Sequence, residues 1–265
     1  MDTIILERDG PIATLTLNRP DSLNALDFAM VDGLVAATAQ IASDDRLRVV
    51  IVRGAGKHFM AGGDVRSFAT DLDKPPAERS ARFGDLIARL HAAIETLDAM
   101  PHVLIAQVHG AVAGFGLSLM NACDLVIAAD NAYFAAAYKT IGTTPDGSGT
   151  WSLPRLVGLR RALEIMLVGD RFDARQALAW GLVNRVVPAG ELDAAVRAVA
   201  DGLASGPALA LRNTRRLLRA AESRSLPEQL AAEAASFAAC VATDDFREGV
   251  TAFLAKRPAQ FGRGS

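Results

Sequence analysis

Two glycine-rich turns in this sequence could bring backbone N–H groups against a bound ligand. One turn contains Gly62 and Gly63, and the other contains Gly114 and Gly116. Glycine has no Cβ atom, so these turns allow the backbone to approach a neighbouring group closely. The second turn leads into an apolar helix at 117–122, whose first N–H groups have no partner within the helix and would point at any group above the turn. A packing corner between a strand and a helix is the alternative interpretation.

A carboxylate that could take part in chemistry follows later in the chain. Asp146 stands in the turn Pro145-Asp146-Gly147. A carboxylate beside a substrate can act as a general base or as a nucleophile. Pro-Asp-Gly is also ordinary turn chemistry, and aspartate is a good cap for a following helix. The local sequence therefore leaves a catalytic and a structural interpretation open.

The elements that would position these turns are buried strands followed by helices. Apolar runs predict strands at 3–7, 12–17, 48–53, 103–108, 125–129 and 132–135. Helical spacing of apolar residues predicts helices at 27–42, 78–100 and 117–122. This repetition of strand, turn and helix favours an α/β core.

The character of the sequence changes after Gly149, where helices alone are predicted. They cover 159–168, 174–180, 191–204, 208–222, 227–242 and 244–255, and several open with a cap or a proline. Their Ala-rich faces suit tight packing within the chain or self-association. We expect a helical layer rather than further α/β units.

Composition excludes several classes of function. The 265 residues have a net charge of −2 and a pI near 6.1, so no basic face for nucleic acid is expected. The first residues, MDTIILERDG, lack the basic start and long apolar core of a signal peptide, so none is expected, and no apolar run is long enough to cross a membrane. Only Cys123 and Cys240 are present, which suits a reducing compartment and predicts a cytoplasmic protein. His58 and His109 flank the two turns, but no spacing typical of a metal site accompanies them.

Six segments, in this order, resemble the crotonase (enoyl-CoA hydratase/isomerase) superfamily. They are NRPDSLNAL at 18–26, HFMAGGDV at 58–65, HGAVAGFGLSL at 109–119 with ACDLVIA at 122–128, IGTTPDGSGTWSLPRLVG at 141–158, GDRFDARQALAWGLVNRVV at 169–187 and FLAKRPAQF at 253–261. Each motif is weak by itself. Together they cover nearly the whole chain at the expected spacing.

The resemblance implies an α/β fold, a crotonase-like spiral of ββα units with a C-terminal helical region that builds trimers or dimers of trimers. We expect residues 1–200 to form the spiral core and 201–265 the oligomerisation region. It also implies an acyl-coenzyme A thioester as substrate, with no cofactor beyond the coenzyme A that the substrate carries. In that family two backbone N–H groups hold the thioester oxygen, and by correspondence these belong to Ala61 and Phe115. Glycine is common at the Phe115 position, so this side chain should fill space near the acyl group.

The acids of this chain depart from the pattern of a hydratase. A hydratase of the family uses two glutamates, and the corresponding positions here are Ser118 and Tyr138. Adding water needs one group that activates the water and another that protonates the α carbon, and neither a serine nor a neutral tyrosine has a suitable pKa at pH 7. Classical two-glutamate hydration is therefore not expected.

The resemblance gives Asp146 two possible uses. In related isomerases an acid at this position moves a proton, and one carboxylate suffices because it serves as base and then as acid. In aryl-CoA dehalogenases the same position is a nucleophile, and that chemistry also needs an aromatic clamp and a base for water. Tyr138 could help to clamp a ring and His91 is a candidate base, although a partly exposed helix histidine is more often without a role. A non-catalytic acyl-CoA-binding protein is the remaining alternative.

The resemblance also implies which residues hold coenzyme A. These are backbone positions near Ser22, Leu23 and Ala25, a second group at Met60, Gly62, Gly63, Asp64 and Val65, and basic residues Lys57 and Lys256 for the phosphates, the last from a neighbouring subunit. Asp64 has a competing structural interpretation, because it can fix its own turn through the backbone.

Overall fold

The core of the protein is a six-stranded sheet in the order β1-β2-β3-β4-β6-β9. The computed structural model describes residues 2–262. The strands are β1 (Ile4–Asp9), β2 (Ile12–Leu17), β3 (Val49–Gly54), β4 (Val103–Val108), β6 (Leu125–Ala129) and β9 (Arg185–Val187). The first two form an antiparallel hairpin and all the others pair in parallel. Parallel strands are buried on both faces, which explains the nearly continuous apolar runs of β3 and β4.

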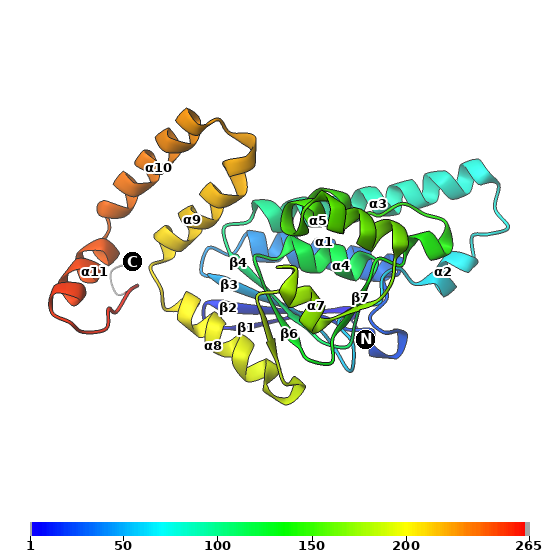
Figure 1. Cartoon of the computed structure of the whole chain (residues 1–265), viewed down its shortest axis with the longest axis horizontal. Helices are drawn as coiled ribbons and strands as arrows, with labels where there is room; N and C mark the ends of the chain where they lie inside the picture. Colours follow the sequence, from blue (N-terminus) through cyan, green and yellow to red (C-terminus); the bar gives the residue numbers. More distant parts are fainter. Residues whose placement is uncertain (1, 263–265) are drawn as a thin grey trace.

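Helices cover both faces of this sheet (Figure 1). The larger core lies between one face and the helices α1 (Phe28–Ala42), α3 (Pro76–Ala99), α4 (Phe115–Ala122) and α5 (Gly149–Val157). The smaller core lies between the other face and α8 (Leu192–Ala204). Alternate residues of β3 serve the two cores, because Val50 and Val52 pack in the larger one and Val49 and Ile51 in the smaller one.

A second, three-stranded sheet extends the core beside the glycine turns. It pairs β5 (Ala111–Ala113) with β7 (Tyr133–Ala135) and β7 with β8 (Phe172–Asp173). The sequence did not predict β5, β8 or β9, and each of these strands is only two or three residues long. Such short segments carry no detectable alternation, so their pairing depends on neighbours that are distant in sequence.

Most predicted helices are present, with differences at two places. The predicted helix 159–168 is α6 (Leu159–Leu163) followed by a π-helical turn, Glu164–Val168, and α7 (Ala174–Ala179) follows β8. Two helices were missed, α2 (Val65–Ala69) and α5. The first is short, and the second contains Pro154 in its interior, where proline normally signals a break.

The last three helices form an arm that projects from the core (Figure 1). They are α9 (Ala208–Ala220), α10 (Leu226–Val241) and α11 (Asp244–Leu254). The arm exposes large apolar side chains, including Phe253, which is 83% exposed. The predicted boundary after residue 200 lies inside α8, whose buried face continues to Ala204. The arm therefore begins after α8, because that helix belongs to the packing of the sheet.

Candidate active site

The site lies where the loops after β3 and β4 meet, at the carboxyl end of the parallel sheet. The Met60 N–H donates to the Ala111 carbonyl at 3.0 Å, and the Ala113 N–H donates to the Met60 carbonyl at 2.8 Å. A Cβ atom on Gly62 would lie 3.4 Å from the Gly114 Cα. The two predicted glycine turns are therefore packed backbone against backbone. In open parallel sheets this end is the usual place for a ligand.

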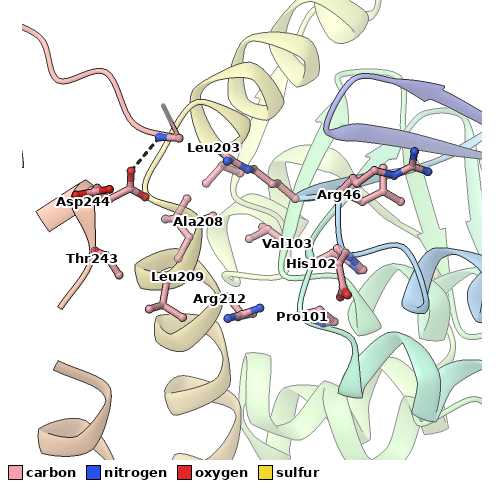
Figure 2. Close-up of a pocket in the computed structure, with 16 residues that line it drawn as sticks. Arg46, Pro101, His102, Val103, Leu203, Ala208, Leu209, Arg212, Thr243 and Asp244 are labelled. Carbon is pink, nitrogen blue, oxygen red and sulfur yellow. Dashed lines mark hydrogen bonds between the residues drawn. The ribbon is translucent and has the colours of Figure 1, made fainter. Parts of the chain in front are cut away.

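A separate cleft of about 610 Å³ lies at the opposite end of the sheet (Figure 2). Its lining residues include Arg46, His102 and Arg212. Residues 45–48 and 101–103 line it at the starts of β3 and β4, whereas the glycine turns follow the ends of these strands. This cleft is therefore distinct from the site that the sequence predicted.

The sequence predicted free backbone N–H groups at Ala61 and Phe115, and the structure differs at the first of these. The Ala61 N–H donates to the Leu23 carbonyl at 3.1 Å, so it is already engaged, contrary to the expectation that it faces a ligand. The Gly62 carbonyl also faces this side, because it accepts from Leu26 N–H at 2.7 Å. A trans peptide holds its N–H opposite its carbonyl, so the Gly63 N–H points away, and it has no partner within residues 2–262.

Gly62 provides the physical reason for this difference. Its φ of +84° belongs to the left-handed region that glycine adopts readily. In a regularly extended strand the N–H groups of residues 61 and 63 would face the same side. The reversed backbone at Gly62 separates them, so the donor of this turn is Gly63. The sequence showed that the turn was glycine-rich but not how its peptide planes were oriented.

Phe115 supplies the other free donor. It is the first residue of α4, and in the described part of the chain its N–H has no partner. Its side chain is only 2% exposed. The ring packs against the turn that contains Asp146: a Cβ atom on Gly147 would lie only 2.5 Å from it. Phe115 therefore combines a free donor with a side chain that supports the turn carrying the acid.

Asp146 and the residue after it, Gly147, are held by three contacts from different parts of the chain. The Tyr138 hydroxyl donates to Asp146 Oδ1 at 2.6 Å, and the Ser118 hydroxyl donates to the Asp146 carbonyl at 2.9 Å. The Gly147 N–H donates to His91 Nε2 at 3.2 Å. The fold thus gathers residues of α3, α4 and the 3₁₀ turn Tyr138–Ile141 around one acid. Asp146 Oδ2 has no recorded partner among residues 2–262.

The surroundings make Asp146 a stronger base than an ordinary aspartate. Burial raises the pKa of Asp146, and the hydrogen bond from Tyr138 and the nearby His91 offset this only in part. Burial and then the negative charge of Asp146 raise the pKa of Tyr138 well above its ordinary value. Tyr138 therefore remains a neutral phenol that donates to the carboxylate. The sequence did not predict that Tyr138 orients the Asp146 carboxylate.

His91 lies beside the acid rather than on an unrelated surface. Because His91 Nε2 accepts the Gly147 N–H, this nitrogen carries no proton in the arrangement described. Its place on α3 follows from helical spacing, since Ile87 and His91 are four residues apart and share a face. From the sequence alone, His91 was more easily explained as a histidine without a role. In the structure it contacts the turn that carries the candidate acid.

Asp64 caps a helix. Its side chain accepts from Arg66 N–H at 3.1 Å and Ser67 N–H at 3.3 Å at the start of α2, and from Arg19 at 2.8 Å. Burial alone would raise the pKa of Asp64, but the hydrogen bond from Arg19 and the backbone bonds lower it below the ordinary value. These contacts fit the structural interpretation of this residue.

The two segments expected to hold coenzyme A lie side by side. Asn24 lies within the first segment, Ser22, Leu23 and Ala25, and its side chain donates to the carbonyls of Ala55 and His58. Leu26 N–H meets the Gly62 carbonyl in the second segment, which contains Met60, Gly62, Gly63, Asp64 and Val65. Lys57 is exposed in the turn after β3, whereas Lys256 lies beyond α11 in the arm. A single chain therefore brings together all of these residues except Lys256.

Among the residues that the structure describes, no three His, Cys, Asp or Glu side chains gather in a way that could hold a metal ion. Within the same range, no helix is long and apolar enough to span a bilayer.

Comparison with known proteins agrees with this architecture. A family model described as enoyl-CoA hydratase/isomerase matches residues 7–264. The 1,2-epoxyphenylacetyl-CoA isomerase of Escherichia coli K12 is 35% identical over 98% of this chain and 98% of its own. The crotonyl-CoA hydratase of Syntrophomonas wolfei is also 35% identical, over 98% of both chains. The crystal structure of an enoyl-CoA hydratase from Polaromonas sp. JS666 has a TM-score of 0.89 and 34% identity, and the match covers 97% of this chain and 98% of that one.

The layered α/β spiral with its paired glycine turns is the fold of a class of enzymes. The chain belongs to the enoyl-CoA hydratase/isomerase family, that is, to the crotonase superfamily. The resemblance seen in the sequence is therefore confirmed, and so is the expected fold.

Proposed function

We propose that this protein isomerises an acyl-CoA thioester with Asp146 as its acid and base. Asp146 Oδ2 removes a proton from the α carbon of a 3-enoyl thioester, and the electrons of the broken C–H bond form a dienolate. The N–H groups of Gly63 and Phe115 donate to the thioester oxygen, on which the negative charge develops. Asp146 then returns the proton to the γ carbon, so the double bond moves and no atom is gained or lost.

One observation carries this proposal. Within residues 2–262, Asp146 is a partly buried carboxylate with one oxygen free, it has no cationic partner in a salt bridge, and it lies next to a turn with a free N–H. Burial without a compensating cation makes a carboxylate basic, as proton abstraction requires. The positions of the two hydratase glutamates are occupied by Ser118 and Tyr138, whose hydroxyls both bond to residue 146.

The place of His91 favours a second candidate function. In a nucleophilic mechanism Asp146 would attack an aromatic carbon of an aryl thioester and expel the leaving group, and water would later cleave the ester. Such cleavage needs a base for the water, and His91 contacts the adjacent residue, Gly147. Tyr138 is less suited to clamp a ring, because its hydroxyl is bound to Asp146 and the residue is 8% exposed.

Coenzyme A binding and assembly belong to the same proposal. The adjacent segments at 22–25 and 60–65 would hold the adenine and pantetheine through their backbones, and Lys57 would meet a phosphate. Lys256 lies in the projecting arm, so it would serve the site of a neighbouring copy in a trimer or dimer of trimers. The exposed apolar side chains of the arm support such self-association.

The proposal is tested by hydrogen exchange and double-bond migration in D₂O. The purified protein is incubated with 3-hexenoyl-CoA or a phenylacetyl-type thioester, and mass spectrometry follows the α and γ positions. Asp146→Asn is measured beside the wild type, with Asp170→Asn as a matched control. Asp170 is exposed and has no recorded partner within residues 2–262.

Exchange or migration that is lost in Asp146→Asn and retained in Asp170→Asn would establish Asp146 as the proton carrier. Full activity of Asp146→Asn would contradict the proposal. Release of halide from a halo-aryl thioester, without exchange, would favour the nucleophilic function. Thioester binding without either reaction, unchanged in Asp146→Asn, would favour a binding protein.

A further inference from the structure

We propose that Tyr138 and Ser118 are positioning residues that reserve Oδ2 of Asp146 for the substrate, and that the Tyr138 hydroxyl also keeps this carboxylate ionised during turnover. The inference rests on the proposed role of Asp146. It gives a role to the two residues, Ser118 and Tyr138, that stand at the positions of the hydratase glutamates. The two hydroxyl side chains lie in contact, with their oxygens 3.3 Å apart. They hold two different atoms of the same residue.

Tyr138 fixes the carboxylate group. A phenol has one proton to donate, and here it is directed at Asp146 Oδ1 at 2.6 Å, within the range of charge-assisted O–H···O⁻ bonds. The tyrosine is 8% exposed, so its hydroxyl has little access to water as an alternative partner. Because Oδ1 is occupied, Oδ2 is the oxygen that remains for a proton from the substrate.

Ser118 fixes the main chain that carries the carboxylate. Its single proton is used in the 2.9 Å bond to the Asp146 carbonyl, so the 3.3 Å contact with Tyr138 is not a second full hydrogen bond from the serine. Gly149 makes room for this contact, because a Cβ atom there would lie 2.7 Å from the Ser118 hydroxyl. The position of Ser118 thus sets where residue 146 stands, and Tyr138 sets how its side chain is turned.

Among residues 2–262, the titratable groups that act on Asp146 are Tyr138 and His91. The phenol favours the ionised carboxylate because it donates to it, whereas His91 would do so through its charge only when protonated, and its Nε2 accepts a hydrogen bond in the arrangement described. Burial acts in the opposite direction. If the phenol is removed, no side-chain donor to the carboxylate remains within residues 2–262, so Asp146 should ionise only at a higher pH.

The first test is the pH profile of exchange in D₂O for Tyr138→Phe. Exchange requires ionised Asp146, so the acid limb of the profile should move to higher pH in this variant. On the acid limb the rate should fall about tenfold for each unit of displacement, whereas the plateau at high pH should change far less. Tyr133→Phe is the matched control and should leave the limb unmoved. A variant with a lower plateau and an unmoved limb would overturn the inference.

The second test does not depend on activity or on a variant of Tyr138. The chain has two tyrosines, so ¹³Cζ-tyrosine labelling yields two signals, and Tyr133→Phe leaves only that of Tyr138. The Tyr138 signal should shift as Asp146 titrates and should lose this shift in Asp146→Asn. A Tyr138 signal that is independent of Asp146 would overturn the inference even if the enzyme is active.

The two proposals can fail separately. If Asp146→Asn still exchanges protons while the Tyr138 signal follows Asp146, the hydrogen bond is present but the proposed function is wrong. If Asp146→Asn is inactive and the acid limb of Tyr138→Phe lies at the same pH as that of the wild type, the proposed function is supported and the positioning role of Tyr138 is wrong. Ser118→Ala should lower kcat with the limb unmoved, because the serine orients the main chain and does not touch the carboxylate.

Discussion

Asp124 and Asp146 are two carboxylates removed from bulk water, and their surroundings are opposite. Asp124 Oδ2 accepts from Leu104 N–H at 2.8 Å and from Arg215 at 2.7 Å, and Oδ1 accepts from Arg219 at 2.7 Å. Asp146 has a phenol on one oxygen, no recorded partner on the other, and no salt bridge within residues 2–262. One carboxylate is fully compensated and the other is not.

This difference separates a structural acid from a reactive one. The Asp124 cluster attaches the arm to the core, because Arg215 also donates to the carbonyls of Leu97 and Asp98 at the end of α3. Both oxygens of Asp124 already accept hydrogen bonds, so neither is free to take a proton from a substrate. Asp146 has a raised pKa and one oxygen without a partner within residues 2–262. Both features are needed by a carboxylate that accepts a proton from a substrate.

The largest effect is expected from breaking the compensated site. Arg215→Met leaves Asp124 and three backbone carbonyls without this donor in a buried place, so the free energy of unfolding should fall by about 3–5 kcal/mol. Urea unfolding at a fixed protein concentration measures it. Arg216→Met is the matched control, since Arg216 is exposed and has no recorded ion pair in the described range, and it should change stability little. Equal effects of the two variants would remove the contrast.

A second prediction extends the contrast to backbone donors. Phe115→Pro removes the free N–H at the first position of α4, where proline fits the helix, and Phe115→Ala removes the same ring but keeps the N–H. Turnover of Phe115→Pro should be about 100- to 1000-fold below that of Phe115→Ala, the usual cost of one oxyanion donor. Equal kcat values in steady-state assays of the two variants would show that this N–H does not face the reacting oxygen.

The pH dependence of stability should have opposite signs at two carboxylates. The pKa of Asp146 is raised, so its contribution is complete at low pH and is lost as the pH rises through its folded pKa. Asp146→Asn should therefore stabilise the fold at pH 7, and the gain should shrink on acidification. The pKa of Asp64 is lowered, so its contribution is present at neutral pH and is lost as the pH falls.

Asp64→Asn keeps a capping side chain but loses the charge facing Arg19, so it should destabilise at pH 7 and converge with the wild type in acid. Urea unfolding across the pH range checks both variants. If both variants destabilise at pH 7, Asp146 is a compensated acid like Asp124.

The smallest effect is expected at an exposed ion pair. Arg155 pairs with Glu222, and their side chains are 39% and 58% exposed. Water screens such a pair, so Arg155→Met should change the free energy of unfolding by less than about 1 kcal/mol. A loss comparable to that of Arg215→Met in the same urea series would mean that exposure does not explain the difference between the ion pairs.

Much of the fold could be predicted from local sequence. The apolar runs that became β3 and β4 are buried on both faces, and the residues of α3 at helical spacing pack into the larger core. Short elements escaped prediction because β5 and β9, with three residues each, are defined by their neighbours. Their pairing is a property of the assembled sheet.

The site shows where sequence reasoning ends. The amino-acid sequence alone determined the glycine turns, the family, the absence of the paired glutamates and the single acid at Asp146. The tertiary structure decided that Gly63 rather than Ala61 offers its N–H, because the peptide plane depends on the backbone conformation of Gly62. It also brought Tyr138, Ser118 and His91 to one acid from separate elements. Local residue types specify which groups are available, but the direction of a donor and the burial of a charge depend on packing between distant segments.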